Sequence, residues 1–279
     1  MKYPRSRINW SIFTNSIIYI VIALFLFFFL FPIFWVITTS FKLRVQTFAI
    51  PPVWIFKPTL QSYKAIFTEM QFSHYLLNST IIAISNTILV VFTGSLAAYS
   101  IARFKTGGNN LSFWILSIRM VPPIVVTVPL FIAFDKLHMI DTHFALILLY
   151  TTLNLPLAVW MMRAFFMEIP EELEESAMID GCSRMQALWR IALPLAKPGL
   201  AATAILCFIF SWNEFLFALI FTRIVAKTAP LAMTTLMTER EIYWGKICAG
   251  ATLVIIPVIV FSFIVQKHIV RGLTFGAIK

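Results

Sequence analysis

The chain has 279 residues, of which 60% are hydrophobic and only 12% are charged. Soluble domains average about 25% charged residues, so this composition excludes an ordinary soluble enzyme and indicates an integral membrane protein. The formal net charge of +10 does not indicate a nucleic-acid-binding protein, because the basic residues lie between apolar runs, where anionic lipid head groups are the better-matched partner.

The first apolar run, residues 17–40, follows a basic N-terminal segment, residues 1–16. A cleavable signal peptide has an apolar core of roughly 7–15 residues, followed by a cleavage site of small residues. The run here is longer, and no convincing cleavage site follows it. We therefore expect an uncleaved first membrane helix, with residues 1–16 forming a cytoplasmic N-terminus.

Five further apolar runs are long enough for a helix of about 20 residues to cross a bilayer. They cover residues 77–101, 111–134, 143–165, 199–222 and 247–267. The sequence therefore predicts an all-α integral membrane protein with six transmembrane helices, in which residues 77–267 form the core. Residues 41–76 are predicted to be a periplasmic loop, and residues 268–279 are predicted to be a cytoplasmic tail.

Six spans place both termini on the same side of the membrane. Lys and Arg are slightly more numerous in the segments that are cytoplasmic when both termini are inside, as the positive-inside rule requires. Lys42 and Arg44 oppose this orientation, so charge favours it only weakly. Prolines within the spans bend helices, and they fit either dense packing or a central cavity with bendable walls. They are Pro32, Pro122, Pro123, Pro129, Pro156 and Pro257.

Half of the 12 acidic residues lie in one short segment between the fourth and fifth spans. They are Glu168, Glu171, Glu172, Glu174, Glu175 and Asp180. Pro170 suits the first turn of a helix, and the glutamates that follow it lie where the helix dipole favours negative charge. Gly181 is placed to end this helix in a left-handed conformation. Ser183 and Gln186 form a capping box that opens a second helix.

The second helix is predicted to end at Pro194 and to carry an apolar stripe at helical spacing. The stripe consists of Met185, Leu188, Trp189 and Ala192. The segment is thus a helix–glycine–helix unit at the membrane surface, with its acidic face projecting away from lipid. A metal site is not expected, because the four histidines lie far from these carboxylates. A solvated acidic face without a partner remains the alternative, although the separately capped second helix argues against a simple linker.

The segment ESAMIDG at 175–181, with Ile191 and Leu193-Pro194-Leu195, resembles the EAA loop of ABC-importer permeases. Ser176 replaces the middle alanine of that pattern with another small residue. Further matches resemble the carbohydrate-importer branch, and in particular the shorter permease subunit of maltose-type transporters. These matches are RMVPP at 119–123, Pro129-Leu130, Asp141-Thr142, SWNEF at 211–215, and the tail residues 271–273 and 276–279.

The resemblance implies that the EAA loop, residues 168–198, is cytoplasmic and that its first helix is a coupling helix. It implies a dimer of cytoplasmic ATPase subunits as partners, which bind ATP and Mg, so that no cofactor and no catalytic residue are expected in this chain. A second, related permease, a periplasmic or lipid-anchored solute-binding protein and a bacterial inner-membrane location are also implied. The residues expected to couple the chain to the ATPase are Glu175, Ala177, Asp180 and Gly181.

A second candidate site lies within the predicted fifth span, where a carboxylate is expensive unless it faces water or a partner. Trp212, Asn213, Glu214 and Phe215 combine aromatic rings with hydrogen-bonding groups, as sugar recognition requires. A structural pair that fixes a helix interface is the alternative interpretation. Arg119 is a further polar residue within a span, and the sequence leaves open whether it pairs with Glu214 or with carbonyls freed by Pro122 and Pro123.

Two other functional classes are weighed against an ABC importer. An ion-coupled secondary transporter for a small polar solute would need paired ionisable groups deep in the bundle, where only Arg119 and Glu214 qualify. An intramembrane protease would need a His-Glu-x-x-His motif, paired aspartates or a serine–histidine arrangement within the spans, and none is evident. Neither class would explain the acidic segment.

Overall fold

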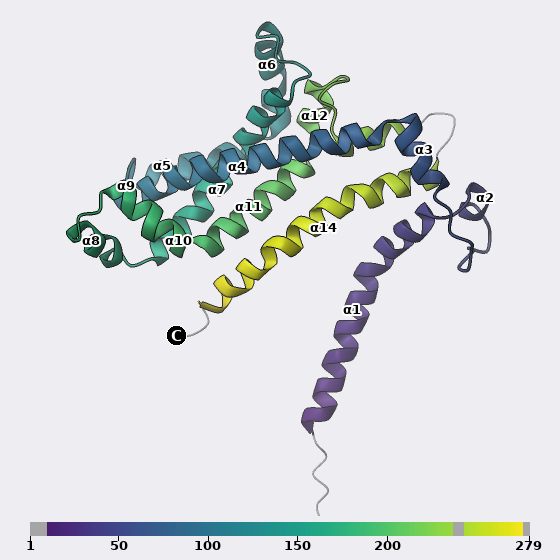
Figure 1. The fold of residues 1–279 in the computed structure, drawn as a ribbon, viewed down its shortest axis with the longest axis horizontal. Coiled ribbons are helices and arrows are strands. Elements are labelled where there is room, and N and C mark those ends of the chain that lie inside the picture. Colours follow the sequence, from purple (N-terminus) through teal and green to yellow (C-terminus); the bar gives the residue numbers. More distant parts are fainter. Residues whose placement is uncertain (1–9, 237–242, 276–279) are drawn as a thin grey trace, which may run out of the picture.

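The computed structural model describes residues 10–236 and 243–275, and every regular element within them is a helix (Figure 1). Four helices are long and apolar enough to cross a membrane. They are α1 (Trp10–Ser40), α4 (Phe72–Phe104), α7 (His143–Glu168) and α14 (Trp244–Phe275). The all-α membrane fold predicted from composition is therefore confirmed.

The predicted third span is broken rather than continuous. It consists of α5 (Gly108–Ser117), η1 (Ile118–Met120) and α6 (Pro123–Lys136), and the two halves are bent by 87°. The break falls at Pro122 and Pro123, which lack the backbone N–H groups that a continuous helix needs there. Single prolines in other spans do not break their helices. Helices α1, α7 and α14 continue through Pro32, Pro156 and Pro257.

The predicted fifth span is also interrupted. Helix α11 (Lys197–Trp212) stops short, residues 213–215 are non-helical, and α12 (Leu216–Phe221) completes the segment. At its other end, α11 meets the helical stretch Arg184–Leu195 at a bend of 77°. If each bent pair counts as one span, the described residues hold up to six candidate spans.

The segments predicted as loops contain short helices. Within residues 41–76 lie α2 (Arg44–Thr47), α3 (Gln61–Glu69) and the first turn of α4. Within residues 223–246 lie α13 (Ala229–Ala232) and η3 (Met233–Leu236), while residues 237–242 are outside the described part. Helix α14 continues past the predicted end of the sixth span at residue 267, and only residues 276–279 of the predicted tail lie outside the described chain.

The core lies where α4, α7 and α11 pack together. Gly94 of α4 allows a close approach, because a Cβ atom at this position would lie 2.8 Å from the Cβ of Ala158 on α7. A buried polar network joins the same three helices. The amide of Asn154 donates to the Asn86 carbonyl oxygen at 3.0 Å and to the Ser211 hydroxyl at 2.9 Å. Such interhelical hydrogen bonds fix the register of helices whose surroundings are otherwise apolar.

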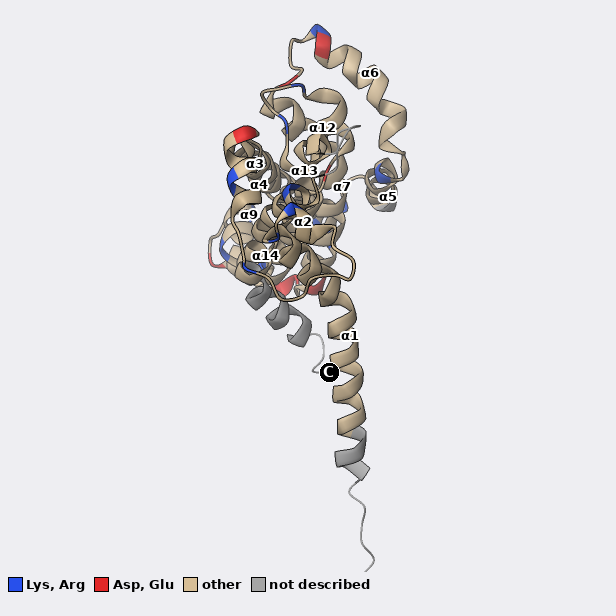
Figure 2. Ribbon diagram, turned by 90° about the vertical axis from the view of Figure 1, so that its right-hand side faces the viewer, with Lys and Arg blue, Asp and Glu red and all other residues tan. Residues whose placement is uncertain are grey.

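Helix α1 diverges from this bundle. Figure 1 shows it running away from α4, α7 and α11, and Figure 2 shows it uncharged along its described length. None of its apolar window is buried within this chain, and large side chains such as Phe28 are exposed. This surface is suited to contact with lipid or with another membrane subunit, because exposing so many apolar side chains to water is unfavourable.

Candidate functional site

The acidic segment folds largely as its sequence predicts. Helix α8 (Glu172–Ile179) has three glutamates in its first turn, and Gly181 follows it with a φ of 92°. The N–H of Cys182 donates to the carbonyl of Ala177 at 2.9 Å and so satisfies the end of the helix. Ser183 and Gln186 form the predicted capping box at the start of α9 (Arg184–Ala187).

The end of the second helix was predicted wrongly. A π turn, η2 (Leu188–Ala192), leads into the helical turn α10 (Leu193–Leu195), so the helix passes Pro194 and ends one residue later. Pro194 has no N–H group to donate, and it lies one residue before the end of this helical stretch. The buried stripe also differs from the predicted one, because Met185 and Trp189 are exposed. The buried residues are Ala187, Leu188, Ala192 and Leu193.

Helix α8 has two contrasting faces. Its exposed face carries Leu173, Met178 and Ile179, of which Ile179 is 87% exposed. Three of the segment's carboxylates share this face, namely Glu172, Glu175 and Asp180. Of the predicted coupling residues, Glu175, Asp180 and Gly181 are exposed, whereas Ala177 is buried against the chain's own core. Figure 1 shows α8 at the end of the bundle opposite α2 and α3.

Glu174 departs from the predicted acidic face, because it points inward and is only 4% exposed. Its Oε1 accepts a hydrogen bond from Arg103 Nε at 2.8 Å and forms an ion pair with Arg103 Nη2 at 2.7 Å. Its Oε2 accepts a hydrogen bond from the Tyr99 hydroxyl at 2.5 Å. Arg103 Nη2 also donates to the carbonyl of Ile169 at 2.9 Å. We call Tyr99, Arg103 and Glu174 the Glu174 cluster.

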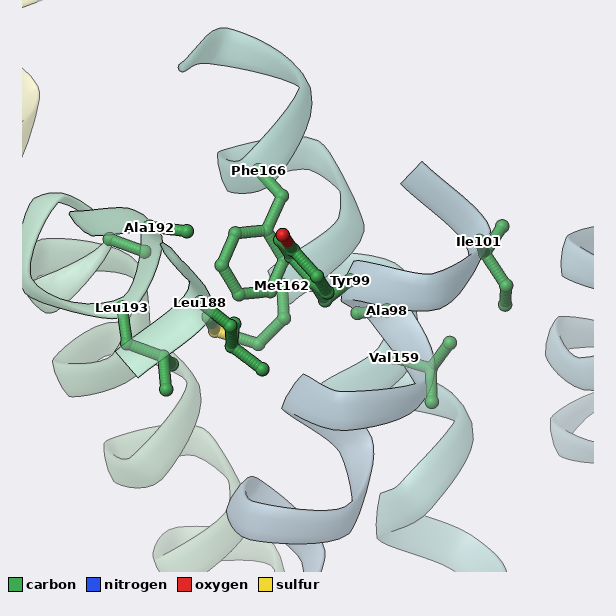
Figure 3. Close-up of a cluster of buried hydrophobic side chains, with 10 residues drawn as sticks. Ala98, Tyr99, Ile101, Val159, Met162, Phe166, Leu188, Ala192 and Leu193 are labelled. Carbon is green, nitrogen blue, oxygen red and sulfur yellow. The ribbon is translucent and has the colours of Figure 1, made fainter. Parts of the chain in front are cut away.

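Sequence reasoning missed this cluster, although one signal was present. Tyr99 and Arg103 are spaced four residues apart, so both lie on one face of the last turns of α4. Figure 3 shows Tyr99 beside Phe166, and their rings meet edge-on with centroids 5.5 Å apart. Nothing in the sequence distinguishes Glu174 from its neighbours, because only tertiary packing decides which glutamate faces Arg103.

The predicted substrate-pathway residues do not share one surface. Trp212 is 1% exposed, and its Nε1 donates to the carbonyl of Val254 on α14 at 3.1 Å. Asn213 is exposed, and its amide donates to the carbonyl of Ile209 at 2.9 Å. Phe215 is also exposed. The tryptophan therefore packs between helices, while Asn213 and Phe215 reach the surface of this chain.

Glu214 caps the short helix α12. Its carboxylate accepts hydrogen bonds from the N–H groups of Phe217 at 2.9 Å and Ala218 at 3.2 Å. An interrupted helix exposes such donors, and a carboxylate at its N-terminal end satisfies them and complements the helix dipole. The break in the fifth span and the position of its carboxylate are thus explained together.

Arg119 and Glu214 line one cavity of about 290 Å³, together with Tyr150, Asn154 and Phe210. They form no ion pair with each other, which answers the question that the sequence left open. The Arg119 guanidinium instead lies 4.8 Å from the centre of the Phe210 ring. This geometry is a cation–π contact, and it leaves a guanidinium and a carboxyl group in the same cavity.

On the opposite side of the bundle from α8, Asp141 organises the segment after α12. Its two carboxylate oxygens accept four backbone hydrogen bonds at 3.0 Å, from the N–H groups of residues 223–226. Burial alone would raise the pKa of Asp141, but these four donors outweigh it and lower the pKa below its ordinary value. Asn78 of α4 holds the same segment through the carbonyls of Val225 and Lys227.

Within the described residues, no group of three or more His, Cys, Asp or Glu side chains could hold a metal ion. The carboxylates of the acidic segment point in different directions: Glu174 is buried, Glu171 is exposed but lies 3.9 Å from Arg103 Nη1, and the others are exposed. The segment therefore offers a structured polar surface rather than a converging set of ligands.

The fold and these sites define a multi-pass helical membrane protein with a structured acidic loop. Residues 90–275 match the model of the family described as "Binding-protein-dependent transport system inner membrane component", and the chain belongs to this family. The family assignment confirms the resemblance seen in the EAA segment.

Named transport proteins match over almost the whole chain. The trehalose/maltose transport system permease protein MalG of Thermococcus litoralis is 39% identical, covering 90% of this chain and 91% of the relative. The trehalose transport system permease protein SugB of Mycobacterium tuberculosis is 41% identical, covering 90% and 92%. A solved bacterial ABC transporter involved in the import of alginate shares the fold, with a TM-score of 0.75 at 22% identity over 96% of this chain and 99% of that chain.

Proposed function

We propose that this chain is the membrane-spanning permease subunit of an ATP-driven ABC importer for a carbohydrate or a related polyol or glycoside. Membership of the binding-protein-dependent family supports the import function. The names of relatives that are permeases for trehalose, trehalose/maltose and sulfoquinovosyl glycerol support a carbohydrate substrate. A periplasmic or lipid-anchored binding protein would deliver this substrate, and a second, related permease would complete the pathway.

The single observation that carries the coupling role is the exposed face of α8. Leu173, Met178 and Ile179 are apolar, yet they project from a surface that also carries carboxylates. Apolar side chains in such a position mark a surface that a partner covers. The partner is a dimer of water-soluble ATPase subunits, which bind ATP and Mg, so that this chain itself hydrolyses no ATP.

This role assigns an orientation. With α8 in the cytoplasm, both termini are cytoplasmic, and the segment held by Asp141 faces the binding protein on the other side. Binding of ATP closes the ATPase dimer and moves the docked α8, and the bundle switches between inward-facing and outward-facing states. Such a switch requires that ATP and substrate each favour one of the two states.

The substrate pathway is assigned to the cavity that Arg119 and Glu214 line, extended by Asn213 and Phe215. Polar groups there are suited to sugar hydroxyls, and Phe210 and Phe215 offer aromatic faces for C–H surfaces. The position of Trp212 against α14 favours a packing role for this residue. The sister permease provides the other wall of the pathway.

The substitution Ile179→Asp tests the docking role, because it places a charge in the centre of the apolar contact. We expect the variant to reach the membrane normally but to lose at least about tenfold in affinity for the ATPase subunits, as truncation of an interface anchor does. The measurement is co-purification and titration of the ATPase against the permease pair in detergent. A matched control is Ile224→Asp, at another highly exposed isoleucine outside α8. Native affinity in the Ile179 variant would refute the docking surface.

A further inference from the structure

The Glu174 cluster ties α8 to a helix that is remote from it in sequence. Glu174 is separated from Arg103 by 71 residues and from Tyr99 by 75. The side chains of Arg103 and Glu174 are only 7% and 6% exposed. A buried charge must be paired, and here both carboxylate oxygens and two nitrogens of the guanidinium are used. The geometry of the contact is therefore strongly specified.

The backbone on each side of α8 is non-helical. Toward α9, the chain turns at Gly181, whose φ of 92° is a conformation that other residues rarely adopt. Toward α7, it passes through an extended residue, Ile169, and Pro170. Arg103 donates to the carbonyl of Ile169, so the cluster also fixes this second connection.

Helix α4 reaches from this cluster to the opposite end of the bundle. Its 33 residues span about 50 Å at a rise of 1.5 Å per residue. Asn86, near its middle, belongs to the polar network with α7 and α11. Asn78 and Ser79, near its far end, hold residues 225–229 through hydrogen bonds. One rigid element thus contacts the acidic segment, the core and the far surface.

We propose that the Glu174 cluster is the joint through which displacement of α8 is delivered to α4, so that α4 moves with the docked segment. This inference rests on the proposed coupling role of α8. Glu174 is then a positioning residue rather than a docking residue, and the carboxylates of α8 divide into Glu174, which faces the chain's own bundle, and Glu172 and Glu175, which face the partner. Loss of the cluster leaves the ATPase docked but separates its motion from the core.

The test replaces the ion pair by a cleavable covalent link. Arg103→Cys and Glu174→Cys are combined with Cys182→Ala, and the complete transporter with its ATPases, sister permease and binding protein is reconstituted in proteoliposomes. The two cysteines are joined by a short bismethanethiosulfonate reagent and separated again by dithiothreitol. Three quantities are measured, namely co-purification of the ATPase, ATP hydrolysis, and uptake of radiolabelled trehalose and maltose per ATP hydrolysed.

Without the link, we expect the ATPase to co-purify and hydrolyse ATP while uptake per ATP falls at least about fivefold. Formation of the link restores uptake per ATP, and dithiothreitol abolishes it again. A merely structural role would lower all three quantities together and would not respond reversibly to the link. Native uptake per ATP in the unlinked variant overturns the proposal.

Two milder variants cover the case in which the double-cysteine chain does not fold. Glu174→Gln keeps the shape and the acceptor for Tyr99 but removes the charge, and Arg103→Lys keeps the charge but loses the fork of donors. Both are expected to lower uptake per ATP, with Glu168→Gln, an exposed carboxylate of the same segment, as the control. Native uptake per ATP in both variants overturns the proposal that the Glu174 cluster links α8 to α4. If the unaltered complex shows no ATP-driven uptake of either sugar, while its ATPase fails to bind, the proposed function fails instead.

Discussion

At the scale of single residues, carboxylates do three different tasks in this chain. Glu174 is paired inside the bundle, Glu214 caps an interrupted helix within the predicted fifth span, and Asp141 gathers four backbone N–H groups at the other end. In each case a buried or half-buried negative charge is matched by donors, because an unmatched one would be strongly destabilising. The acidic residues of α8 that lack such donors are those on its exposed face.

The environment of Asp141 predicts a pH dependence. The pKa of Asp141 in the folded chain lies below its ordinary value of 3.8, because four backbone donors stabilise the charged form. Its contribution to stability is therefore complete above pH 3.8 and is lost as the pH falls through the lower, folded-state value. We expect the thermal midpoint of Asp141→Asn to lie below that of the unaltered chain at pH 7, with the difference shrinking as the pH is lowered below 3.8.

The measurement is thermal unfolding in detergent across this pH range. The control is Asp135→Asn, which changes a carboxylate near the end of α6 that caps no comparable loop. A difference between Asp141→Asn and the unaltered chain that stays constant with pH would contradict the assignment.

At the scale of elements, proline content did not determine where helices break. The helix breaks at Pro122-Pro123, where two adjacent residues lack donors, but α1, α7 and α14 pass their single prolines. Neighbouring helices and hydroxyl groups compensate one missing hydrogen bond more readily than two. The break at residues 213–215 has another cause, because Glu214 supplies acceptors for the start of α12.

The contact between α4 and α7 predicts the effect of a small-to-large substitution. In Gly94→Val, the new Cβ would lie 2.8 Å from the Cβ of Ala158, so the two helices must separate. We expect a loss of about 1–3 kcal/mol of stability, the usual cost of overpacking. The measurement is the thermal midpoint of the purified chain in detergent, with Ile88→Val on the exposed side of α4 as the control. An unchanged midpoint for Gly94→Val would show that the interface tolerates separation.

At the scale of the whole molecule, the chain is built to be part of an assembly. Helix α1 has none of its apolar window buried, and α8 presents apolar side chains outside the apolar bundle. The isolated chain leaves the apolar side chains of both α1 and α8 uncovered.

The rival interpretation as an ion-coupled secondary transporter predicts a different result for the isolated chain. We expect proteoliposomes that contain this chain alone to show no trehalose or maltose uptake above background under a proton or sodium gradient. The physical reason is that Arg119 and Glu214 are the only Arg, Lys, Asp or Glu side chains that line this cavity within the described residues, and Glu214 already accepts hydrogen bonds from the start of α12. Uptake is measured with radiolabelled sugar, and the complete complex with ATP is the positive control. Gradient-driven uptake by the chain alone would favour the rival.

Much of the architecture could be predicted from local pattern. Continuous apolar runs indicate membrane helices because a bilayer leaves the backbone no other way to satisfy its hydrogen bonds. Gly181 and the Ser183–Gln186 capping box predicted the shape of the acidic segment, because caps involve residues only a few positions apart. The family resemblance of residues 175–195 was likewise local, and the family match over residues 90–275 confirms it.

Contacts between distant segments were decided only by tertiary structure. The amino-acid order does not reveal that Glu174, rather than Glu175, meets Arg103, that Trp212 packs on α14, or that Glu214 and Arg119 share a cavity without pairing. Each of these three contacts depends on how the packed helices are rotated and tilted. A shift of one residue along a helix would turn the side chain away from its partner. Sequence alone thus determined the membrane fold, the capped acidic segment and the family, while packing decided which carboxylates face the bundle and which remain free to meet a partner.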